Sequence, residues 1–219
     1  MQTASHILSI VAEARREIIG AEIYSSEFYR KERAAYLFFR KDKTKTALGL
    51  SYHPQGSGAV CLSAGKIEIR TGEKPFPFFQ NAIGAIVTNV ERLHNDRIIK
   101  IEFELSQKAG AVILEATGPA GNMWLLDGNF TKRAVLRNRK FESGDKYAPP
   151  AGASKNPLEE LNRERLLEMS ESANEELLFR ALVANFGGLN DTLAREGLCR
   201  ANINPDSECR DINSDDASS

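Results

Sequence analysis

Hydrophobic positions recur at helical spacing at the start of the chain and in alternation after it. Over residues 3–19 the apolar side chains return every three or four positions, which is the pattern of an amphipathic helix. Gly20 predicts the end of this helix, because glycine readily adopts the left-handed backbone that closes helices. From residue 21 onward apolar and polar residues alternate, which is typical of half-buried strands.

This alternating region predicts two sets of antiparallel strands. Strands are expected in the first set at 22–24, 35–40, 46–52, 59–62 and 66–70, and in the second at 85–93, 97–105, 111–116 and 123–127. A short helix is expected between the sets at 78–83, and 131–136 is expected as a last strand or a helical turn. Polar or glycine-rich breaks separate the strands, which favours a meander over alternating strands and helices. The prediction is an α+β fold: an N-terminal helix with a two-sheet antiparallel β-sandwich or barrel.

The composition changes near residue 147. Residues 147–157 are rich in proline and alanine and predict a linker. Helices are expected at 158–169, 175–186 and 191–200, and the Asp- and Ser-rich end predicts a disordered acidic tail. The expected domains are therefore 1–157, a small all-α unit at 158–204, and the tail at 205–219.

Composition narrows the class of protein. No apolar run approaches the roughly 20 residues that span a bilayer, and the N-terminus lacks the unbroken apolar stretch of a signal peptide. A cytoplasmic protein is therefore expected. Cys61, Cys199 and Cys209 have no zinc-site spacing and predict reduced thiols.

The sequence offers little for catalysis. The three histidines stand in unlike contexts without ligand spacing, and no phosphate loop, dinucleotide fingerprint or nucleophile elbow is present. We therefore expect no enzyme activity, no cofactor and no metal.

Charge is divided unevenly along the chain, although the net charge is −1. Residues 1–157 carry 23 Lys and Arg against 16 Asp and Glu, whereas residues 158–219 carry 6 against 14. A positive body favours a polyanionic partner. Such a division also occurs in proteins that bind no nucleic acid.

Three segments are candidates for contacts with nucleic acid. Gly187, Gly188, Leu189 and Asn190 lie between two expected helices, as in a helix-hairpin-helix that holds a phosphate at a helix N-terminus, or in a corner that only packs two helices. Five cations occur within nine positions and could contact an RNA backbone or form a solvated sheet edge: Lys132, Arg133, Arg137, Arg139 and Lys140. Asp96 and Arg97 lie at the entry to an expected strand, where a plain turn is the simpler interpretation.

Ordered short motifs along the chain resemble one known family. They lie at 75–79, 95–101, 115–127, 144–150 and 186–196, and include Asp-Arg-Ile-Ile from residue 96 and Gly-Asp-Lys-Tyr-Ala-Pro-Pro from residue 144. Together they resemble the NFACT N-terminal domain of ribosome quality-control proteins of the FbpA, RqcH and NEMF type.

The resemblance implies a fold and a partner. The family domain is similar to the N-terminal domain of formamidopyrimidine-DNA glycosylases, but Met1 and Gln2 replace the catalytic Pro-Glu, so base excision is not implied. Members bind tRNA and the large ribosomal subunit that carries a stalled peptidyl-tRNA. The tRNA-handling Asp-Arg pair of the family corresponds to Asp96 and Arg97. The chain lacks the coiled coil and the NFACT-R domain of the family, so it is expected to be a fragment or a short member.

Three functions compete at this point. The first is a non-catalytic module that binds tRNA and the large ribosomal subunit. The second is an adhesion or protein-binding module of the fibronectin-binding kind. The third is a DNA-binding, glycosylase-like protein without catalysis. Salt dependence separates the first and third from the second, because phosphate contacts weaken steeply as salt rises.

Overall fold

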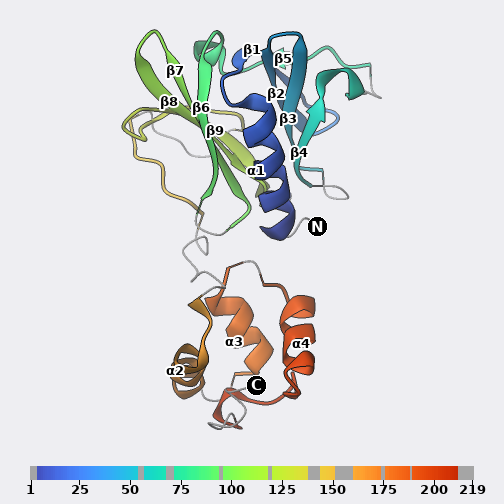
Figure 1. Ribbon diagram of the computed structural model, residues 1–219, viewed down its shortest axis with the longest axis vertical. Helices are drawn as coiled ribbons and strands as arrows, with labels where there is room; N and C mark the ends of the chain where they lie inside the picture. The colour runs from blue at the N-terminus through green and yellow to red at the C-terminus, as the bar shows by residue number, and fades with distance from the viewer. Residues whose placement is uncertain are drawn as a thin grey trace. The chain divides into compact units, whose positions relative to one another are not determined.

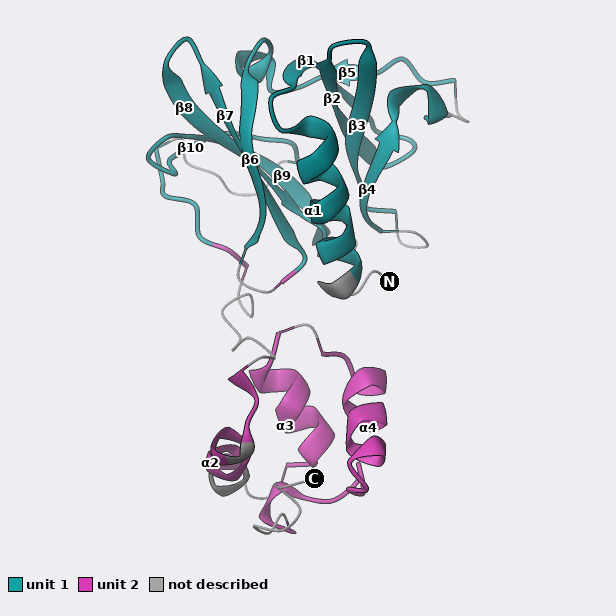
Figure 2. Ribbon diagram, in the orientation of Figure 1, with its two compact units in different colours: residues 1–93, 97–148 teal, residues 94–96, 149–219 magenta. Residues whose placement is uncertain are grey.

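The computed structural model describes most of the chain in two compact units. The described residues are 4–53, 57–67, 72–93, 96–117, 120–137, 144–150, 160–173, 176–187 and 189–211. Unit 1 comprises residues 1–93 and 97–148, and unit 2 comprises residues 94–96 and 149–219 (Figure 2). Among the described helices, none is long and apolar enough to cross a membrane.

Unit 1 contains one long helix, α1 (Ala4–Ile18), and an antiparallel sheet (Figure 1). The strands of the first set are β1 (Glu22–Tyr29), β2 (Ala34–Lys41), β3 (Thr44–Ser51) and β4 (Gly58–Ser63). The strands of the second set are β6 (Ile86–Leu93), β7 (Ile98–Leu105), β8 (Lys108–Glu115), β9 (Asn122–Asp127) and β10 (Lys132–Val135). Short elements join them: η1 (Ala64–Lys66), β5 (Phe76–Pro77) and η2 (Gln80–Ala82).

The two sets of strands form one open sheet, which corrects the prediction of two. The strand order is β10-β9-β8-β7-β6-β1-β2-β3-β4, with β5 paired to β1. The start of β1 lies beside β6, because Gly20 N–H donates to the carbonyl of Val87 at 2.8 Å and Val87 N–H donates to that of Ala21 at 2.9 Å. The chain therefore continues one hydrogen-bond ladder from the second set into the first, and no sandwich of separate sheets is needed to bury the core.

The core of unit 1 is built around one face of α1. Ile7, Val11, Ala14 and Ile18 are spaced as one side of a helix and each is at most 4% exposed. They share a cluster with apolar side chains of both strand sets. In Figure 1 α1 runs between β6 and β4, and it packs against β6 and β7 of one set and β2, β3 and β4 of the other. The helix predicted at 3–19 is confirmed.

Local details differ from the pattern-based expectations. The last segment at 131–136 resolves as strand β10. The expected helix at 78–83 shrinks to the single turn η2, preceded by Phe79 in a left-handed conformation with φ of 48°. The expected strand at 66–70 is wrong at its start, because Lys66 ends the turn η1; residues 68–70 lie outside the described ones. The alternation there does not reveal the helical turn that follows β4.

Unit 2 is a small helical body with its own core. Its helices are α2 (Arg163–Ala173), α3 (Leu178–Asn185) and α4 (Asp191–Arg200), followed by the turn η5 (Cys209–Asp211). Leu178, Phe179 and Phe186 are at most 3% exposed and form its centre. All three cysteines of the chain are free thiols. Burial raises the pKa of the Cys61 thiol in unit 1 to about 11 and also raises that of Cys209.

The prediction of a disordered tail from residue 205 is wrong for residues 205–211. Leu178 N–H donates to the carbonyl of Ser207, and Cys209 N–H donates to that of Glu176, each at 2.9 Å. Cys209 is fully buried in the core of unit 2. The polar composition of this segment gives no sign of the buried Cys209 or of the backbone hydrogen bonds around it. Residues 212–219 lie outside the described residues.

We predict that the buried face of α1 determines the stability of unit 1. Ile18→Ala removes a fully buried side chain and should lower the free energy of unfolding by about 2–5 kcal/mol. Urea denaturation followed by the fluorescence of Trp124, the only tryptophan, measures this in unit 1. Leu8→Ala is the matched control, since Leu8 lies on the same helix but is 48% exposed; equal losses for the two variants would contradict the prediction.

Candidate nucleic-acid interface

The Asp96–Arg97 pair lies in the turn between β6 and β7. Both residues are half-buried, and both already interact with neighbours in the folded chain. The carbonyl of Arg97 accepts a hydrogen bond from Ala116 N–H at 2.7 Å. The Arg97 backbone is therefore held at the end of the sheet where β8 ends, and not on an independent loop.

Strand register brings Arg137 to this same end of the sheet. Ile98 in β7 pairs with Glu115 in β8, and Glu115 pairs with Asn122 in β9. The Asn122 side chain then accepts a hydrogen bond from Arg137 N–H at 3.0 Å. This row across β7, β8 and β9 thus brings Arg97, which directly precedes Ile98, and Arg137 to the same end of the sheet, although 40 positions separate them in the sequence.

The Arg137 side chain is held in place by its surroundings. Its Nη1 donates to the carbonyl of Gly121 at 2.9 Å. The guanidinium lies 4.3 Å from the ring centroid of Tyr52, at the end of β3, in a cation–π contact. A cation that is already ordered loses less conformational entropy when it meets a phosphate. Sequence analysis did not identify Tyr52, because no local signal links it to a residue 85 positions away.

Two residues of the family-like motifs meet at this end of the sheet. The Tyr147 hydroxyl donates to Oε1 of Glu115 at 3.1 Å. Glu115 is only 2% exposed, so the Tyr147 hydroxyl meets one oxygen of a carboxylate that is shielded from water. The bond ties the segment after β10 to the strand end beside Arg97. Sequence analysis quoted both residues as motif positions but assigned neither a role.

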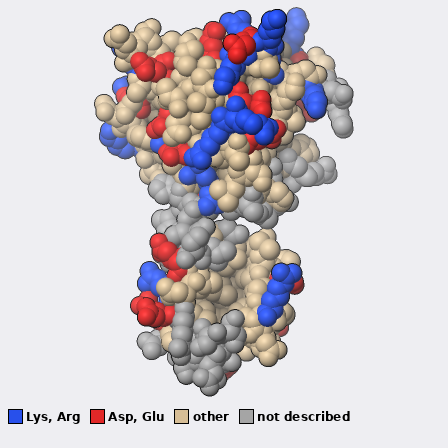
Figure 3. All heavy atoms as spheres, viewed as in Figure 1, with Lys and Arg blue, Asp and Glu red and all other residues tan. Residues whose placement is uncertain are grey.

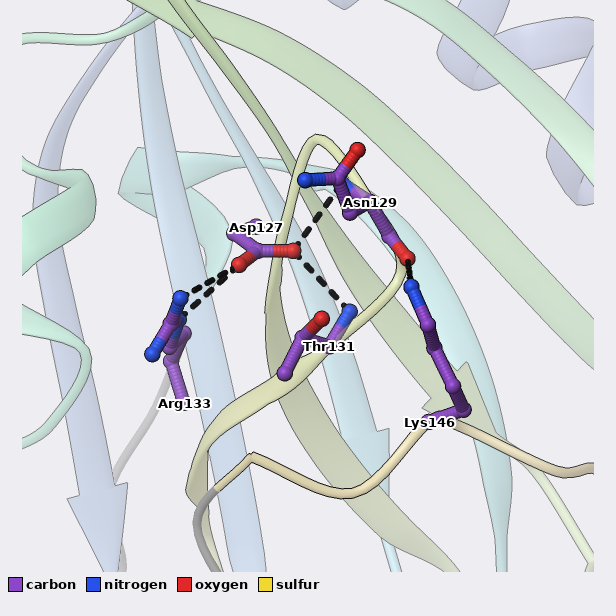
Figure 4. Close-up of polar contacts among 5 residues, drawn as sticks. All are labelled: Asp127, Asn129, Thr131, Arg133 and Lys146. Atoms are coloured by element: carbon purple, nitrogen blue, oxygen red, sulfur yellow. Dashed lines mark hydrogen bonds and ion pairs between the residues drawn. The ribbon is translucent and has the colours of Figure 1, made fainter.

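The remaining described cations of the basic cluster lie at the other end of β10. Lys132 Nζ is 5.2 Å from the ring centroid of Trp124. Arg133 forms a two-pronged contact with Asp127 Oδ2, at 3.1 Å from Nε and 2.6 Å from Nη2 (Figure 4). The predicted five-residue patch is therefore divided: Lys132 and Arg133 flank the β9–β10 turn, Arg137 lies at the opposite end, and Arg139 and Lys140 lie outside the described residues.

Asp127 organises the β9–β10 turn. Its Oδ1 accepts hydrogen bonds from the N–H groups of Thr131 at 3.0 Å and Asn129 at 2.9 Å, as Figure 4 shows. The Thr131 N–H, followed by Arg133 and the Asn129 N–H, lowers the pKa of Asp127 to about 2. The charge of Arg133 is paired with the Asp127 carboxylate here, which makes Arg133 a weaker candidate for a phosphate contact.

The predicted hairpin of unit 2 lies between α3 and α4. Asn190 is the N-cap of α4, and its Oδ1 accepts from Leu193 N–H at 2.9 Å. Asp191 follows in the first turn, where its charge competes with an incoming anion. Gly187 and Leu189 belong to the connection, while Gly188 lies outside the described residues. The structure shows two packed helices with a capped second helix.

Charge on the visible face of unit 1 is mixed. In Figure 3 Lys and Arg are interspersed with Asp and Glu around α1. Binding of a polyanion would thus depend on local groups such as Arg97 and Arg137 more than on a uniform positive field. Among the described residues, no cluster of His, Cys, Asp or Glu is arranged to hold a metal ion.

Comparison with known proteins identifies similar folds and a family. A family model described as NFACT N-terminal and middle domains matches residues 4–219. The N-terminal domain of fibronectin-binding protein PavA from Streptococcus pneumoniae is similar with a TM-score of 0.68 and 24% identity, over 91% of this chain and 83% of that chain. The N-terminal part of the fibronectin/fibrinogen-binding protein from Streptococcus suis is similar with a TM-score of 0.70 and 21% identity, over 96% and 84%. The fibrinogen binding protein from Staphylococcus aureus gives a TM-score of 0.71 and 18% identity, over 94% and 77%. No curated protein matches this chain.

We predict that the pKa of Asp127 remains low without Arg133. Arg133→Gln should raise it only part of the way to the ordinary 3.8, because the Thr131 and Asn129 N–H groups still favour the carboxylate. A carboxyl-carbon NMR titration of Asp127 in the wild type and the variant measures this. Since the folded pKa is depressed, the ionised carboxylate stabilises the fold above the ordinary pKa, and this contribution is lost as the pH falls through about 2. A return to the ordinary pKa in the variant would contradict the assignment.

Proposed function

We propose, from the premise that this chain belongs to the family of NFACT N-terminal and middle domains, that it is a non-catalytic, cytoplasmic RNA-binding module of ribosome quality control. Its partners are tRNA and the large ribosomal subunit that carries a stalled peptidyl-tRNA. The contact to tRNA is made by the sheet end with Asp96 and Arg97. The observation that carries the proposal is the row of strand ends that gathers Arg97 and Arg137.

The chemistry of this sheet end supports an RNA contact. Arg presents a planar fork of donors that matches a phosphate, and its charge persists at every physiological pH. Arg137 is ordered by Gly121, Asn122 and Tyr52 before any ligand arrives. Asp96, which directly precedes Arg97 in the sequence, would contribute an acceptor, and an acceptor suits a base edge or a ribose hydroxyl better than a phosphate. A pair that offers both a hydrogen-bond acceptor and a donor favours a specific contact with RNA over a general electrostatic attraction.

Unit 2 adds a second contact in this proposal. The α3–α4 pair is the predicted helix-hairpin-helix, and the N–H groups at the start of α4 would face a phosphate. Asn190 already satisfies the N–H of Leu193, and Asp191 weakens the attraction. This contact is therefore expected to contribute less than the sheet end in unit 1.

A protein ligand is the second candidate. The three similar structures described above are named for binding fibronectin or fibrinogen, and all three share the fold of this chain at 24% identity or less. Contact with such a partner would not require phosphate neutralisation. Immobilised fibronectin and fibrinogen, measured beside tRNA in one assay at two salt concentrations, separate the candidates.

We predict that this chain binds tRNA and that Arg97→Ala weakens the binding severalfold. Loss of one phosphate contact should also lower the slope of affinity against salt by about one. Fluorescence anisotropy of labelled tRNA between about 50 and 200 mM salt measures both quantities. The matched control is Lys108→Ala, which removes an exposed cation from the turn at the other end of β7.

Three outcomes would contradict the proposal. The first is an equal loss of affinity in the Arg97 and Lys108 variants, which would indicate nonspecific attraction. The second is tighter binding to a DNA duplex of the same charge, which would favour a DNA-binding protein. The third is binding to fibronectin or fibrinogen that is insensitive to salt, without measurable binding to tRNA, which would favour the protein-binding candidate.

A further inference from the structure

A row of aromatic rings lies on the outer face of the first strand set. Alternation along β2 directs Leu37 and Phe39 into the core and Tyr36 and Phe38 to the opposite face. The rings of Tyr24, Phe38, Tyr36 and Tyr29 follow one another across β1 and β2. Successive centroids are 6.1, 6.2 and 6.1 Å apart. The sequence pattern predicts strands at Tyr24, Tyr36 and Phe38 but gives these rings no role in binding.

The members of this aromatic row differ in exposure. Tyr29 and Phe38 are 6% and 8% exposed, so they anchor the row. Tyr24 and Tyr36 remain partly exposed. Val60 and Leu62 continue the same face on β4, with partly exposed side chains. A sheet face facing water is normally polar, so apolar and aromatic side chains that remain partly exposed on it suggest a ligand.

Gly49 makes room for the Tyr36 ring. It faces Tyr36 across the β2–β3 ladder. A Cβ added at Gly49 would lie 2.5 Å from one ring carbon of Tyr36 and 2.6 Å from another. The ring therefore covers the glycine backbone, a pairing that fixes an aromatic side chain against a sheet. Its position is set by the strand and not by a flexible loop, which suits a stacking surface.

Cations stand at both ends of the aromatic row. The β2–β3 hairpin, residues 40–45, has four cations and one acid, and all six residues are exposed. The guanidinium of Arg40 and Nζ of Lys45 lie 5.7 and 5.5 Å from the Tyr24 ring centroid. The β1–β2 hairpin, residues 30–33, has three cations and one acid. This arrangement, aromatic rings between cationic ends, matches a strand that offers bases in the middle and phosphates along its length.

A shallow groove opens beside Tyr24. It lies between residues 24–27 of β1, which begin at the register shift between Ile23 and Ser25, and Pro75, Pro77 and Gln80, and its volume is about 240 Å³. This is smaller than the ~300–1,000 Å³ of sites for drug-sized ligands, which suits one planar ring. The proline rings offer apolar contacts, and Gln80 and Ser25 offer polar groups for a base edge. The groove and the aromatic row form one continuous surface through Tyr24.

We propose that this outer face of β1–β3, with the groove beside Tyr24, binds unpaired nucleotides of RNA by stacking. The rings are spaced more widely than the ~3.4 Å rise of a stacked strand, so they suit splayed bases and not a duplex. On binding, the side chains of Arg40 and Lys45 move from the Tyr24 ring to the phosphates. This movement costs little free energy, because exposed ion pairs and cation–π contacts are weak. The assignment rests on the proposed function only in taking RNA as the polymer, and it uses different residues.

The first test introduces a fluorescent reporter into the row. Tyr24→Trp should keep affinity for a single-stranded oligouridylate of about eight nucleotides, a length within the range for single-strand-binding folds. Its added tryptophan emission should be quenched as a base stacks on it. Leu8→Trp is the matched control, since it places a tryptophan at an exposed position of α1 outside the aromatic row. Equal quenching in both variants, or none in Tyr24→Trp, would overturn the proposal.

The second test measures affinity and separates the two proposals. Tyr24→Leu should weaken oligouridylate binding about fivefold or more, and Lys45→Gln should reduce the salt slope by about one relative to Lys108→Gln. Thermal unfolding of Tyr24→Leu checks that the variant is folded. If Arg97→Ala weakens tRNA binding but the Tyr24 and Lys45 variants bind the oligonucleotide like the wild type, the aromatic face is excluded while the proposed function stands.

The reverse result has the opposite meaning. Oligonucleotide binding that depends on Tyr24, together with tRNA binding unchanged by Arg97→Ala, supports the aromatic face and excludes the sheet-end contact. An acidic peptide of the same charge that competes with the oligonucleotide at equal concentration would indicate a protein ligand for this face and overturn the assignment to RNA. No binding of the oligonucleotide to the wild-type chain overturns it as well.

Discussion

Burial of one face of α1 is the interaction on which the rest of unit 1 depends. The strands of each set present one apolar face, and both faces close on Ile7, Val11, Ala14 and Ile18. Because the helix occupies the middle of the core, the sheet can remain open and still shield its apolar side chains. The backbone pairing of residues 20–23 with the start of β6 then fixes where the first set begins relative to the second. Without that junction the two sets would have no defined register.

Register in turn places the polar groups at the sheet ends. A slip of one residue would exchange the two faces of a strand and is strongly opposed by the buried core. The row from Ile98 through Glu115 and Asn122 to Arg137 is thus a consequence of core packing. A hydrogen bond from Tyr147 to Glu115 joins the segment after β10 to this row, next to the strand that begins beside Arg97. The stability of unit 1 and the positions of its candidate binding residues therefore depend on the same strand pairing.

The distribution of charge reconciles a near-neutral chain with the polyanionic partner that we propose. Several cations have structural partners: Arg133 with Asp127, and Lys100 with Glu91 and Glu102. Others stand at strand ends and hairpins, beside aromatic rings that can stack. Net charge is therefore a poor guide to binding in this chain. Some cations stabilise turns, whereas others lie next to aromatic groups and are the candidates for binding. The acidic residues gathered in unit 2 account for much of the neutralisation.

The sequence by itself determined the helix of unit 1, the succession of antiparallel strands and the small helical unit, because their apolar periodicities are local and strong. Ordered motifs also identified the family. Only the tertiary structure decided that the strands form one sheet, since hydrogen bonding between β1 and β6 joins residues more than 60 positions apart and leaves no local pattern. The same holds for the division of the basic cluster and the contacts of Arg137 with Tyr52 and of Tyr147 with Glu115. Residues 205–211 were misjudged because composition averages over a segment, whereas the single buried side chain of Cys209 anchors it. Proximity across a sheet is set by register, and register is fixed only when the whole core is packed.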